Sequence, residues 1–311
     1  MEKLLEVKDL KVSFFTDLGE TQAVKDAGFA IEEGDFFGIV GESGSGKSVT
    51  TKSILRLGPS NCRIMGGEIL FQGEDILKKS EAELREIRGG EIAMIFQDSL
   101  SALNPVYTVG NKMVELIRRH TSMTKKEAKA RVLELLTAVG ITDPEKAMRS
   151  YPHELSGGMR QRVMIAMAMS SNPKVLIADE PTTALDVTIQ AQILHLLLEL
   201  QKKNNMSIIL ITHDLGVVAQ TCKRVAVMCG GYVVEEGTVE EIFLNPGHPY
   251  TQALIASMPR VGGTFEQFLE RDLSDGSGNL CPFLNRCKYA DKTCEACLPK
   301  YYESSEEHKI L

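Results

Sequence analysis

Short apolar runs rich in β-branched residues alternate with longer stretches of helical periodicity along most of the chain. Four runs are apolar at nearly every position: "FFGIVG" from Phe36, "IAMIFQ" from Ile92, "KVLIADE" from Lys174 and "SIILITHD" from Ser207. Continuous apolar runs of this length predict strands that are buried on both faces. Because helical patterns separate them, the sequence indicates an α/β fold with a largely parallel sheet.

Two parts of the chain depart from this alternation. The segments "VSFFTDLGETQAV" and "GGEILFQGEDI" carry shorter, more polar strand patterns, which are typical of antiparallel β-structure. Between Ser99 and Ser171 strand signals vanish, and helical patterns such as "KKEAKARVLELLTAVG", which ends at Gly140, dominate. We therefore expect an N-terminal antiparallel β subdomain and a helical insertion over residues 99–171.

A long amphipathic helix is predicted over "DVTIQAQILHLLLELQKK". Asp186 is a suitable N-cap for it, and its apolar side chains fall on one stripe: Ile189, Ile193, Leu196, Leu197 and Leu200. After Gly237 the pattern loosens, through "NPGHPYTQALIASMPR" and a Gly- and Ser-bearing stretch, into a cluster of cysteines. We predict a first domain over residues 1–245 and a small C-terminal extension over residues 246–311.

Composition narrows the class of protein. The 311 residues are 43% hydrophobic and 25% charged, as in ordinary globular proteins. The net charge of −7 argues against nucleic acid as a partner, because phosphate binding leaves a basic footprint. No apolar run approaches the ~18 residues of a membrane span, and the charged start "MEKLLEVKDL" is unlike a signal peptide. We expect a cytosolic chain.

The segment "GESGSGKS", from Gly41 to Ser48, matches the phosphate-binding P-loop pattern. It follows a predicted strand and opens a predicted helix, a context that disfavours an ordinary glycine-rich turn. Its glycines let backbone N–H groups surround phosphate oxygens, and the helix N-terminus adds positive potential. Lys47 would reach the β- and γ-phosphates of a nucleotide, and Ser48 would bind Mg²⁺. The fold class is thus an α/β P-loop NTPase.

Polar residues at the ends of predicted strands supply the remaining chemistry. Asp179 and Glu180 end "KVLIADE", where Asp179 would hold Mg²⁺ and Glu180 would polarise water for attack on the γ-phosphate. Gln97 ends a second strand and His213 a third, so the first could contact Mg²⁺ or the attacking water and the second the γ-phosphate. Single polar strand ends usually meet solvent, but their shared location favours an active site.

The order of P-loop, glutamine, "LSGG", "DE" and histidine resembles the ATP-binding subunit of ABC transporters over nearly all of residues 1–245. "LSGGMRQR", from Leu155, is similar to the signature motif of that family, with Met159 where glutamine is commonest. The resemblance implies an ATP hydrolase whose ATPase domains pair head to tail. The P-loop of one chain and the "LSGG" of the other then enclose one ATP with its Mg²⁺.

Further site residues follow from the resemblance alone. It implies that the P-loop contacts ATP through its whole length: Gly41, Glu42, Ser43, Gly44, Ser45, Gly46, Lys47, Ser48 and Val49. It implies that three signature residues cradle the nucleotide of the neighbouring chain: Ser156, Gly157 and Gly158. Asp186, in "TALD", matches an interface position, and Phe14 matches the aromatic residue that stacks on adenine. Phe15 is an alternative for that role, and either ring could belong to the core.

The segments "NPGHPYTQALIASMP" and "FQDSLSALNP" resemble the di- and oligopeptide importer branch of the family. This implies ATP-driven peptide uptake, a sister ATPase subunit, two transmembrane permease subunits, and indirectly an extracytoplasmic peptide-binding protein. The chain would lie peripherally on the cytoplasmic face of the cell membrane, with the permeases held near Ser99 to Tyr107.

Alternative functions stay open at this point. Nickel importers share parts of both segments, so a nickel or other small-solute importer is one alternative. A soluble ABC ATPase acting on nucleic acid or ribosomes is another, which the acidic charge and the lack of long coiled-coil insertions or a second ATPase domain disfavour. Intact Lys47, Asp179, Glu180 and His213 argue against a non-hydrolysing regulatory subunit.

Four cysteines near the end of the chain have the spacing C-x5-C-x6-C-x2-C: Cys281, Cys287, Cys294 and Cys297. In a cytosolic protein this favours a metal over disulfides. The first three resemble a motif of peptide-importer ATPases that binds a [4Fe-4S] cluster, while Zn²⁺ and free thiols stay open. The resemblance places the fourth ligand shortly after a histidine like His308, so either Cys297 substitutes or a tail beyond Leu311 is missing. The scattered Cys62, Cys222 and Cys229 are expected to be buried and inert.

Overall fold

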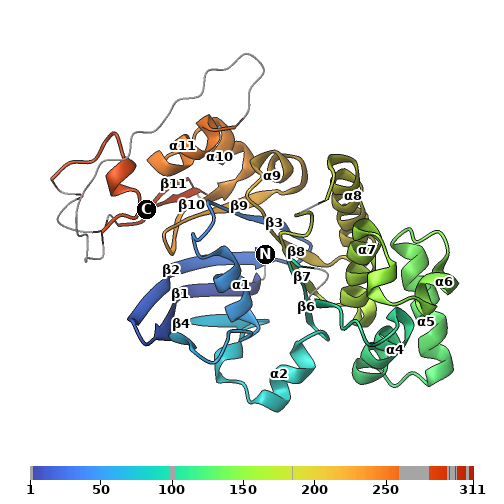
Figure 1. The fold of residues 1–311 in the computed structure, drawn as a ribbon. Coiled ribbons are helices and arrows are strands. Elements are labelled where there is room, and N and C mark those ends of the chain that lie inside the picture. The colour runs from blue at the N-terminus through green and yellow to red at the C-terminus, as the bar shows by residue number, and fades with distance from the viewer. Residues whose placement is uncertain are drawn as a thin grey trace. The chain divides into compact units, whose positions relative to one another are not determined.

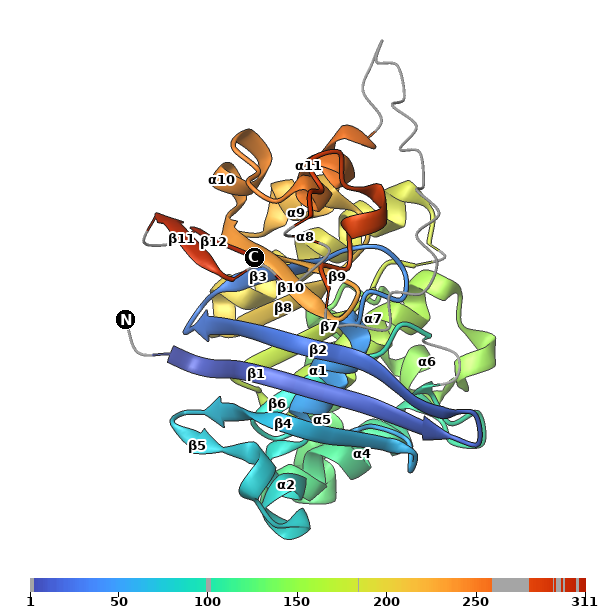
Figure 2. The same cartoon turned by 90° about the vertical axis from the view of Figure 1, so that its left-hand side faces the viewer.

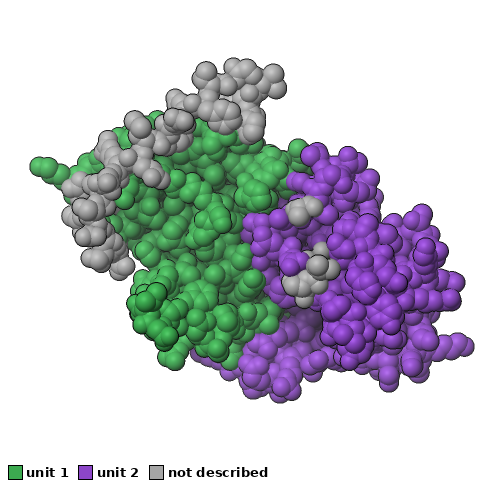
Figure 3. Space-filling view, viewed as in Figure 1, with its two compact units in different colours: residues 1–32, 36–77, 212–311 green, residues 33–35, 78–211 purple. Residues whose placement is uncertain are grey.

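The computed structural model describes residues 3–98, 102–183, 185–258, 280–292, 294, 298, 300–305 and 308–311. Its contacts divide the chain into two compact units (Figure 3). The first unit comprises residues 1–32, 36–77 and 212–311, and the second comprises residues 33–35 and 78–211. This division follows spatial contacts rather than the sequence pattern, so the predicted boundary at residue 245 stays a prediction.

Two long antiparallel strands begin the first unit. β1 (Lys3–Thr16) pairs with β2 (Gly19–Glu32) on one side and with β4 (Cys62–Phe71) on the other, and β5 (Glu74–Asp75) pairs with β4 (Figure 2). Along β1 most of the buried side chains are apolar, and the core includes Leu5, Val7, Leu10 and Val12. The predicted antiparallel subdomain is therefore confirmed.

A second group of strands in the first unit surrounds the P-loop. β3 (Phe36–Val40), buried at every position, pairs in parallel with β9 (Arg224–Cys229), which pairs antiparallel with β10 (Tyr232–Thr238). The described part of this unit also holds four α-helices: α1 (Lys47–Ile54), α9 (Leu215–Thr221), α10 (Val239–Leu244) and α11 (Pro249–Ala256). A short 3-10 helix, η1 (Ile76–Lys78), spans the boundary between the two units in the sequence.

The C-terminal residues join the same unit. A short 3-10 helix, η4 (Leu284–Arg286), follows Cys281. The hairpin of β11 (Tyr302–Ser305) and β12 (His308–Ile310) pairs through β12 with Glu235 and Glu236 of β10, which pairs with β2 at Tyr232. Figure 1 shows α10 and α11 in orange and the C-terminal hairpin in red, all near β10. These residues share a core with α9–α11 that includes Val234, Ile242 and Phe283.

The second unit holds a three-stranded parallel sheet. β7 (Val175–Asp179) lies between β6 (Ile92–Ile95) and β8 (Ser207–Ile211), and the residues of β7 and β8 are all buried. Its helices are α2 (Glu81–Ile87), α4 (Val109–His120), α5 (Lys125–Ala138), α6 (Pro144–Arg149), α7 (Gly157–Ala168), α8 (Val187–Asn204), and the 3-10 helices η2 (Pro152–Glu154) and η3 (Met169–Ser171). The predicted α/β core and helical insertion are both confirmed.

Local sequence explains where these helices start and stop. Thr124 and Glu127 form a capping box at the start of α5, and Gly140 adopts a φ of 78° just beyond its end. The Asp186 carboxylate accepts from the Ile189 N–H at 2.9 Å and caps α8, as the sequence predicts. Among the described residues, the helices are too short or too polar to cross a bilayer.

Candidate functional site

The P-loop joins β3 to α1 in a conformation that requires glycine. Gly41, Gly44 and Gly46 have φ values of 147°, 80° and 103°, which other residues rarely adopt. A Cβ on Gly41 would collide with the Met228 carbonyl oxygen, and a Cβ on Gly46 would lie 2.8 Å from that of Ala23. The loop is therefore pressed against two neighbouring strands, and its shape is fixed by packing as well as by sequence.

Lys47 spans the mouth of this loop. The residue is 5% exposed, and its ammonium group donates hydrogen bonds to the carbonyl oxygens of Gly41 at 2.7 Å and Glu42 at 2.8 Å. The loop thus gathers a buried cation, the N-terminus of α1 and the flanking hydroxyls of Ser45 and Ser48. These are the groups that a polyphosphate requires.

Two predicted catalytic residues lie together in the second unit. Gln97 Nε2 donates to Glu180 Oε2 at 3.0 Å. They meet because β6 and β7 are parallel neighbours, so their carboxyl ends lie at the same edge of the sheet. β6 ends at Ile95, however, so Gln97 lies beyond the strand that the sequence pattern extended to it.

Glu180 adopts an uncommon backbone conformation. Its φ is 47°, in the left-handed region, and its N–H donates to the Ile211 carbonyl oxygen at 3.0 Å. The carboxylate also accepts from Thr183 Oγ1 at 2.9 Å, a contact that sequence reasoning missed although Thr183 lies only three residues further on. Two donors and a constrained backbone hold this carboxylate in place, as at many functional sites. The adjacent Asp179 is 1% exposed at the end of β7.

The signature segment starts α7 in the second unit. Ser156 is the N-cap, and its Oγ accepts from the Met159 N–H at 3.3 Å. A Cβ on Gly158 would lie 3.0 Å from Ile189 Cγ2, so the absence of a side chain also lets α8 approach. An open pocket of about 580 Å³ is lined by residues of both motifs: Ser156, Gly157, Gly158, Met159, Arg162, Leu185, Asp186 and Ile189.

The remaining predicted side chains, His213 and Phe14, belong to the first unit. His213 is exposed two residues before α9, and β8 ends at Ile211 rather than at the histidine. Phe14 is half-buried on β1, while the Arg63 guanidinium lies 5.0 Å from the Phe15 ring centroid. The adenine-stacking role of Phe14 stays a prediction.

The cysteines match the sequence expectations only in part. Cys229 is buried, whereas Cys62 and Cys222 are half-buried rather than fully buried. Burial raises the pKa of all three thiols, to about 12 for Cys222 and Cys229, which leaves them protonated and unreactive.

The predicted metal centre has no support in the described residues. Cys281, Cys287 and Cys294 are close enough for the latter two thiols to raise the pKa of Cys281, after the larger effect of its burial. Cys297 lies outside the described residues. Within the described part of the chain, no three His, Cys, Asp or Glu side chains form a group that could hold a metal ion. The [4Fe-4S] cluster and the Zn²⁺ alternative are therefore not supported.

The P-loop also has contacts that sequence reasoning missed. Arg286, between Cys281 and Cys294, pairs with the Glu42 carboxylate, and the Tyr250 hydroxyl accepts from the Glu42 N–H at 2.8 Å. The Arg286 hydrogen bonds lower the pKa of Glu42. In the sequence Tyr250 and Arg286 lie in the segments "HPYTQ" and "NRC", and nothing in those segments indicates that they contact the P-loop.

Comparison with known proteins agrees with this geometry. A family model described as "ABC transporter" matches residues 24–183, and one described as "Oligopeptide/dipeptide transporter, C-terminal region" matches residues 234–294. The oligopeptide transport ATP-binding protein OppD of Bacillus subtilis (strain 168) is 56% identical over 268 residues, covering 86% of this chain and 75% of that protein. The dipeptide transport ATP-binding protein DppD of the same organism is 49% identical, covering 100% of this chain and 94% of that protein.

Solved structures show the same fold. The ATP-binding cassette MJ0796, in a dimeric post-hydrolysis state with ADP and Pi, superposes with a TM-score of 0.68 at 29% identity. The match covers 76% of this chain and 98% of that one.

Proposed function

Because this chain belongs to the ABC transporter ATPases, we propose that it powers the import of dipeptides or oligopeptides through partner membrane permeases. It is an ATP-hydrolysing transporter subunit. The match of residues 234–294 to the oligopeptide and dipeptide transporter C-terminal region supports the cargo class, and so do the two relatives that carry these functions in their names.

The Gln97–Glu180 pair carries the mechanistic proposal. Glu180 is the general base that takes a proton from water as it attacks the γ-phosphate. Gln97 and Thr183 hold the carboxylate through hydrogen bonds of 3.0 and 2.9 Å, so the base is oriented before substrate arrives. His213 is proposed to contact the γ-phosphate.

The P-loop carries the binding proposal. Lys47 exchanges its present carbonyl partners for the β- and γ-phosphate oxygens, while the loop N–H groups bind the same phosphates. Mg²⁺ prefers oxygen ligands, and such oxygens are available on the side chains of Ser48, Gln97 and Asp179. When bound, Mg²⁺ neutralises charge on the phosphates.

We further propose that each nucleotide is enclosed by two chains, this one and a sister ATPase. The open pocket beside Ser156 and Asp186 supports this, because it places the signature at a surface that a second subunit can cover. The isolated chain should then hydrolyse ATP slowly, and its rate of hydrolysis should rise when the sister subunit is added. Full activity of a monomer, unaffected by Ser156→Arg, would contradict the shared site.

An apolar pocket of about 300 Å³ in the second unit supports docking of the permeases. Its apolar lining includes Met94, Phe96, Leu103, Leu116, Met164 and Met167. Phe96 is 37% exposed and directly precedes Gln97, so movement of its side chain would reach the amide that holds Glu180. Nearby Val106 and Tyr107 are exposed, while residues 99–101 of the expected docking segment lie outside the described residues. We propose two permease subunits, an extracytoplasmic peptide-binding protein, and a peripheral location on the cytoplasmic face of the cell membrane.

The experiment is uptake by the full complex reconstituted in vesicles. Labelled dipeptide and labelled Ni²⁺ are offered in parallel, with ATP on the side of the ATPases. We expect ATP-dependent dipeptide uptake, its loss in Glu180→Gln, and its retention in Glu199→Gln, which removes an exposed carboxylate from α8. Uptake of Ni²⁺ without dipeptide would contradict the cargo, and equal phosphate release by Glu180→Gln would contradict the base.

A further inference from the structure

The second residue of the P-loop is held by residues far away in the sequence. Arg286 donates to both carboxylate oxygens of Glu42, through Nη1 and Nη2 at 2.8 Å each. The Glu42 N–H donates to the Tyr250 hydroxyl at 2.8 Å. These partners lie 244 and 208 residues further along the chain. One P-loop residue is thus held through both its side chain and its backbone.

Arg286 has an electrostatic role in a loop that binds polyphosphate. Glu42 places a negative charge on the loop that must bind the negatively charged phosphates of ATP. An unpaired carboxylate there opposes ATP binding through Coulomb repulsion. The bidentate guanidinium offsets that charge in place. Exposed ion pairs by themselves stabilise proteins little, and Glu42 has a side chain that is 50% exposed. The expected effect is therefore on nucleotide affinity rather than on folding.

Tyr250 fixes the path of the loop backbone. It is 1% exposed, and burial raises its pKa above the usual range, so the hydroxyl stays neutral. By accepting from the Glu42 N–H, the hydroxyl holds the backbone of the loop in the turn that precedes Lys47. Its ring packs edge-on against Phe283, with ring centroids 5.4 Å apart.

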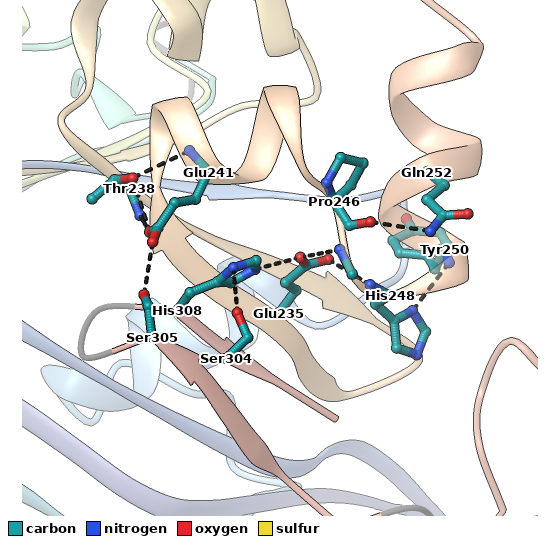
Figure 4. Close-up of polar contacts among 11 residues, drawn as sticks. Glu235, Thr238, Glu241, Pro246, His248, Tyr250, Gln252, Ser304, Ser305 and His308 are labelled. Carbon is teal, nitrogen blue, oxygen red and sulfur yellow. Dashed lines mark hydrogen bonds and ion pairs between the residues drawn. The ribbon is translucent and has the colours of Figure 1, made fainter.

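The start of α11, which carries Tyr250, is itself anchored by buried polar groups (Figure 4). The His248 Nδ1 accepts from the Tyr250 N–H at 3.0 Å. The Glu235 carboxylate accepts from the N–H groups of Gly247 at 2.7 Å and His248 at 3.0 Å, and pairs with His308 Nε2 at 2.7 Å. The last strand of the chain therefore supports the position of Tyr250.

The cysteine segment, residues 281–287, carries the other contact. Its single turn is closed by hydrogen bonds from Leu284 N–H to the Cys281 carbonyl oxygen at 3.1 Å and from Cys287 N–H to that of Leu284 at 3.3 Å. Arg286 lies within this turn, and its guanidinium is 5.0 Å from the Phe283 ring centroid. The main-chain groups of both cysteines therefore help to set the position of Arg286.

We propose that Tyr250 and Arg286 are positioning residues for the P-loop, through which the cysteine segment sets the affinity for ATP. The proposal rests on the nucleotide-binding role proposed above for the P-loop, but its test measures nucleotide binding and is independent of the cargo. Neither residue touches the nucleotide in this scheme, since both act through Glu42.

The test is titration of the assembled complex with a fluorescent ATP analogue in the presence of Mg²⁺, together with the KM for ATP and kcat. We expect Arg286→Ala to weaken nucleotide binding about three- to tenfold, the scale of a charge-assisted hydrogen-bond pair that is partly exposed. KM should rise while kcat stays close to that of the parent. Tyr250→Phe retains the ring and should also weaken binding.

Two further variants separate positioning from general structural damage. Arg286→Ala combined with Glu42→Gln should restore affinity to within about twofold, because the unpaired charge is gone; loss of fold would not be rescued in this way. Lys288→Ala removes an exposed positive charge two residues after Arg286 and should leave nucleotide binding unchanged. Unaltered affinity in both Arg286→Ala and Tyr250→Phe, or no rescue by Glu42→Gln, would overturn the proposal.

Discussion

Gln97 donates a hydrogen bond of 3.0 Å to Glu180, although 83 residues separate the two side chains in the sequence. The contact exists because the two residues follow neighbouring parallel strands that end at the same edge of the sheet. It connects the proposed general base to a residue adjacent to the apolar pocket proposed for the permeases. In the proposed mechanism this hydrogen bond links the catalytic base to the docking site of the permeases.

Glu180→Gln should preserve ATP binding and nearly abolish turnover. The amide keeps an oxygen that can accept from Gln97, but it cannot take a proton from water, and loss of a general base costs about 10²- to 10⁴-fold. Phosphate release and nucleotide binding by the full complex measure both quantities. Thr183→Ala, which removes only one donor to Glu180, should cost far less than Glu180→Gln.

Lys47→Ala should abolish tight nucleotide binding. Lys47 is nearly buried, and its ammonium group donates to the loop carbonyl oxygens of Gly41 and Glu42. Its loss removes the charge that balances the β- and γ-phosphates. Titration with a fluorescent nucleotide measures the effect. Lys52→Ala removes an equal charge from the last turn of α1, and unchanged affinity is expected there.

Asp186 offers a way to separate a structural from an interface role. Its carboxylate caps α8, so Asp186→Ala should lower the free energy of unfolding by about 1 kcal/mol. Asp186→Asn retains an oxygen for the cap and should change stability little. If the proposed interface needs the charge, the asparagine variant will lose turnover while its denaturation midpoint matches that of the parent. Equal turnover in Asp186→Asn would argue that only the cap matters.

Stability should depend on pH through His248. Burial lowers the pKa of this imidazole from 6.5 to about 4 in the folded chain, with Glu235 opposing the shift. Between these values the unfolded chain binds more protons than the folded one, so the free energy of unfolding is complete above pH 6.5 and falls as the pH drops toward 4. The loss is at most about 3 kcal/mol, since one pKa unit corresponds to about 1.4 kcal/mol.

Denaturant unfolding over that pH range tests the His248 prediction. His248→Asn keeps an N-cap acceptor but cannot titrate, so its stability should vary less with pH than that of the parent. His195→Asn removes an exposed imidazole from α8 and should leave the pH dependence unchanged. An identical slope in His248→Asn and the parent would rule out His248 as the source.

The sequence by itself determined features that depend on short spacings. Continuous apolar runs identified β3, β7 and β8, Gly140 marked the end of α5, and "GESGSGKS" identified the phosphate loop. Each of these signals lies within a few residues, where backbone geometry and local hydrogen bonds set the outcome. The branch of the family was likewise carried by short segments.

Only the tertiary structure decided which distant residues meet. The contacts of Arg286 and Tyr250 with Glu42, and the pairing of β12 with β10, have no periodic signature in the sequence. Contacts across more than 200 residues depend on how the intervening chain folds and packs. Residue spacing does not encode that geometry, and so the support of the P-loop by the C-terminal residues emerged only in three dimensions.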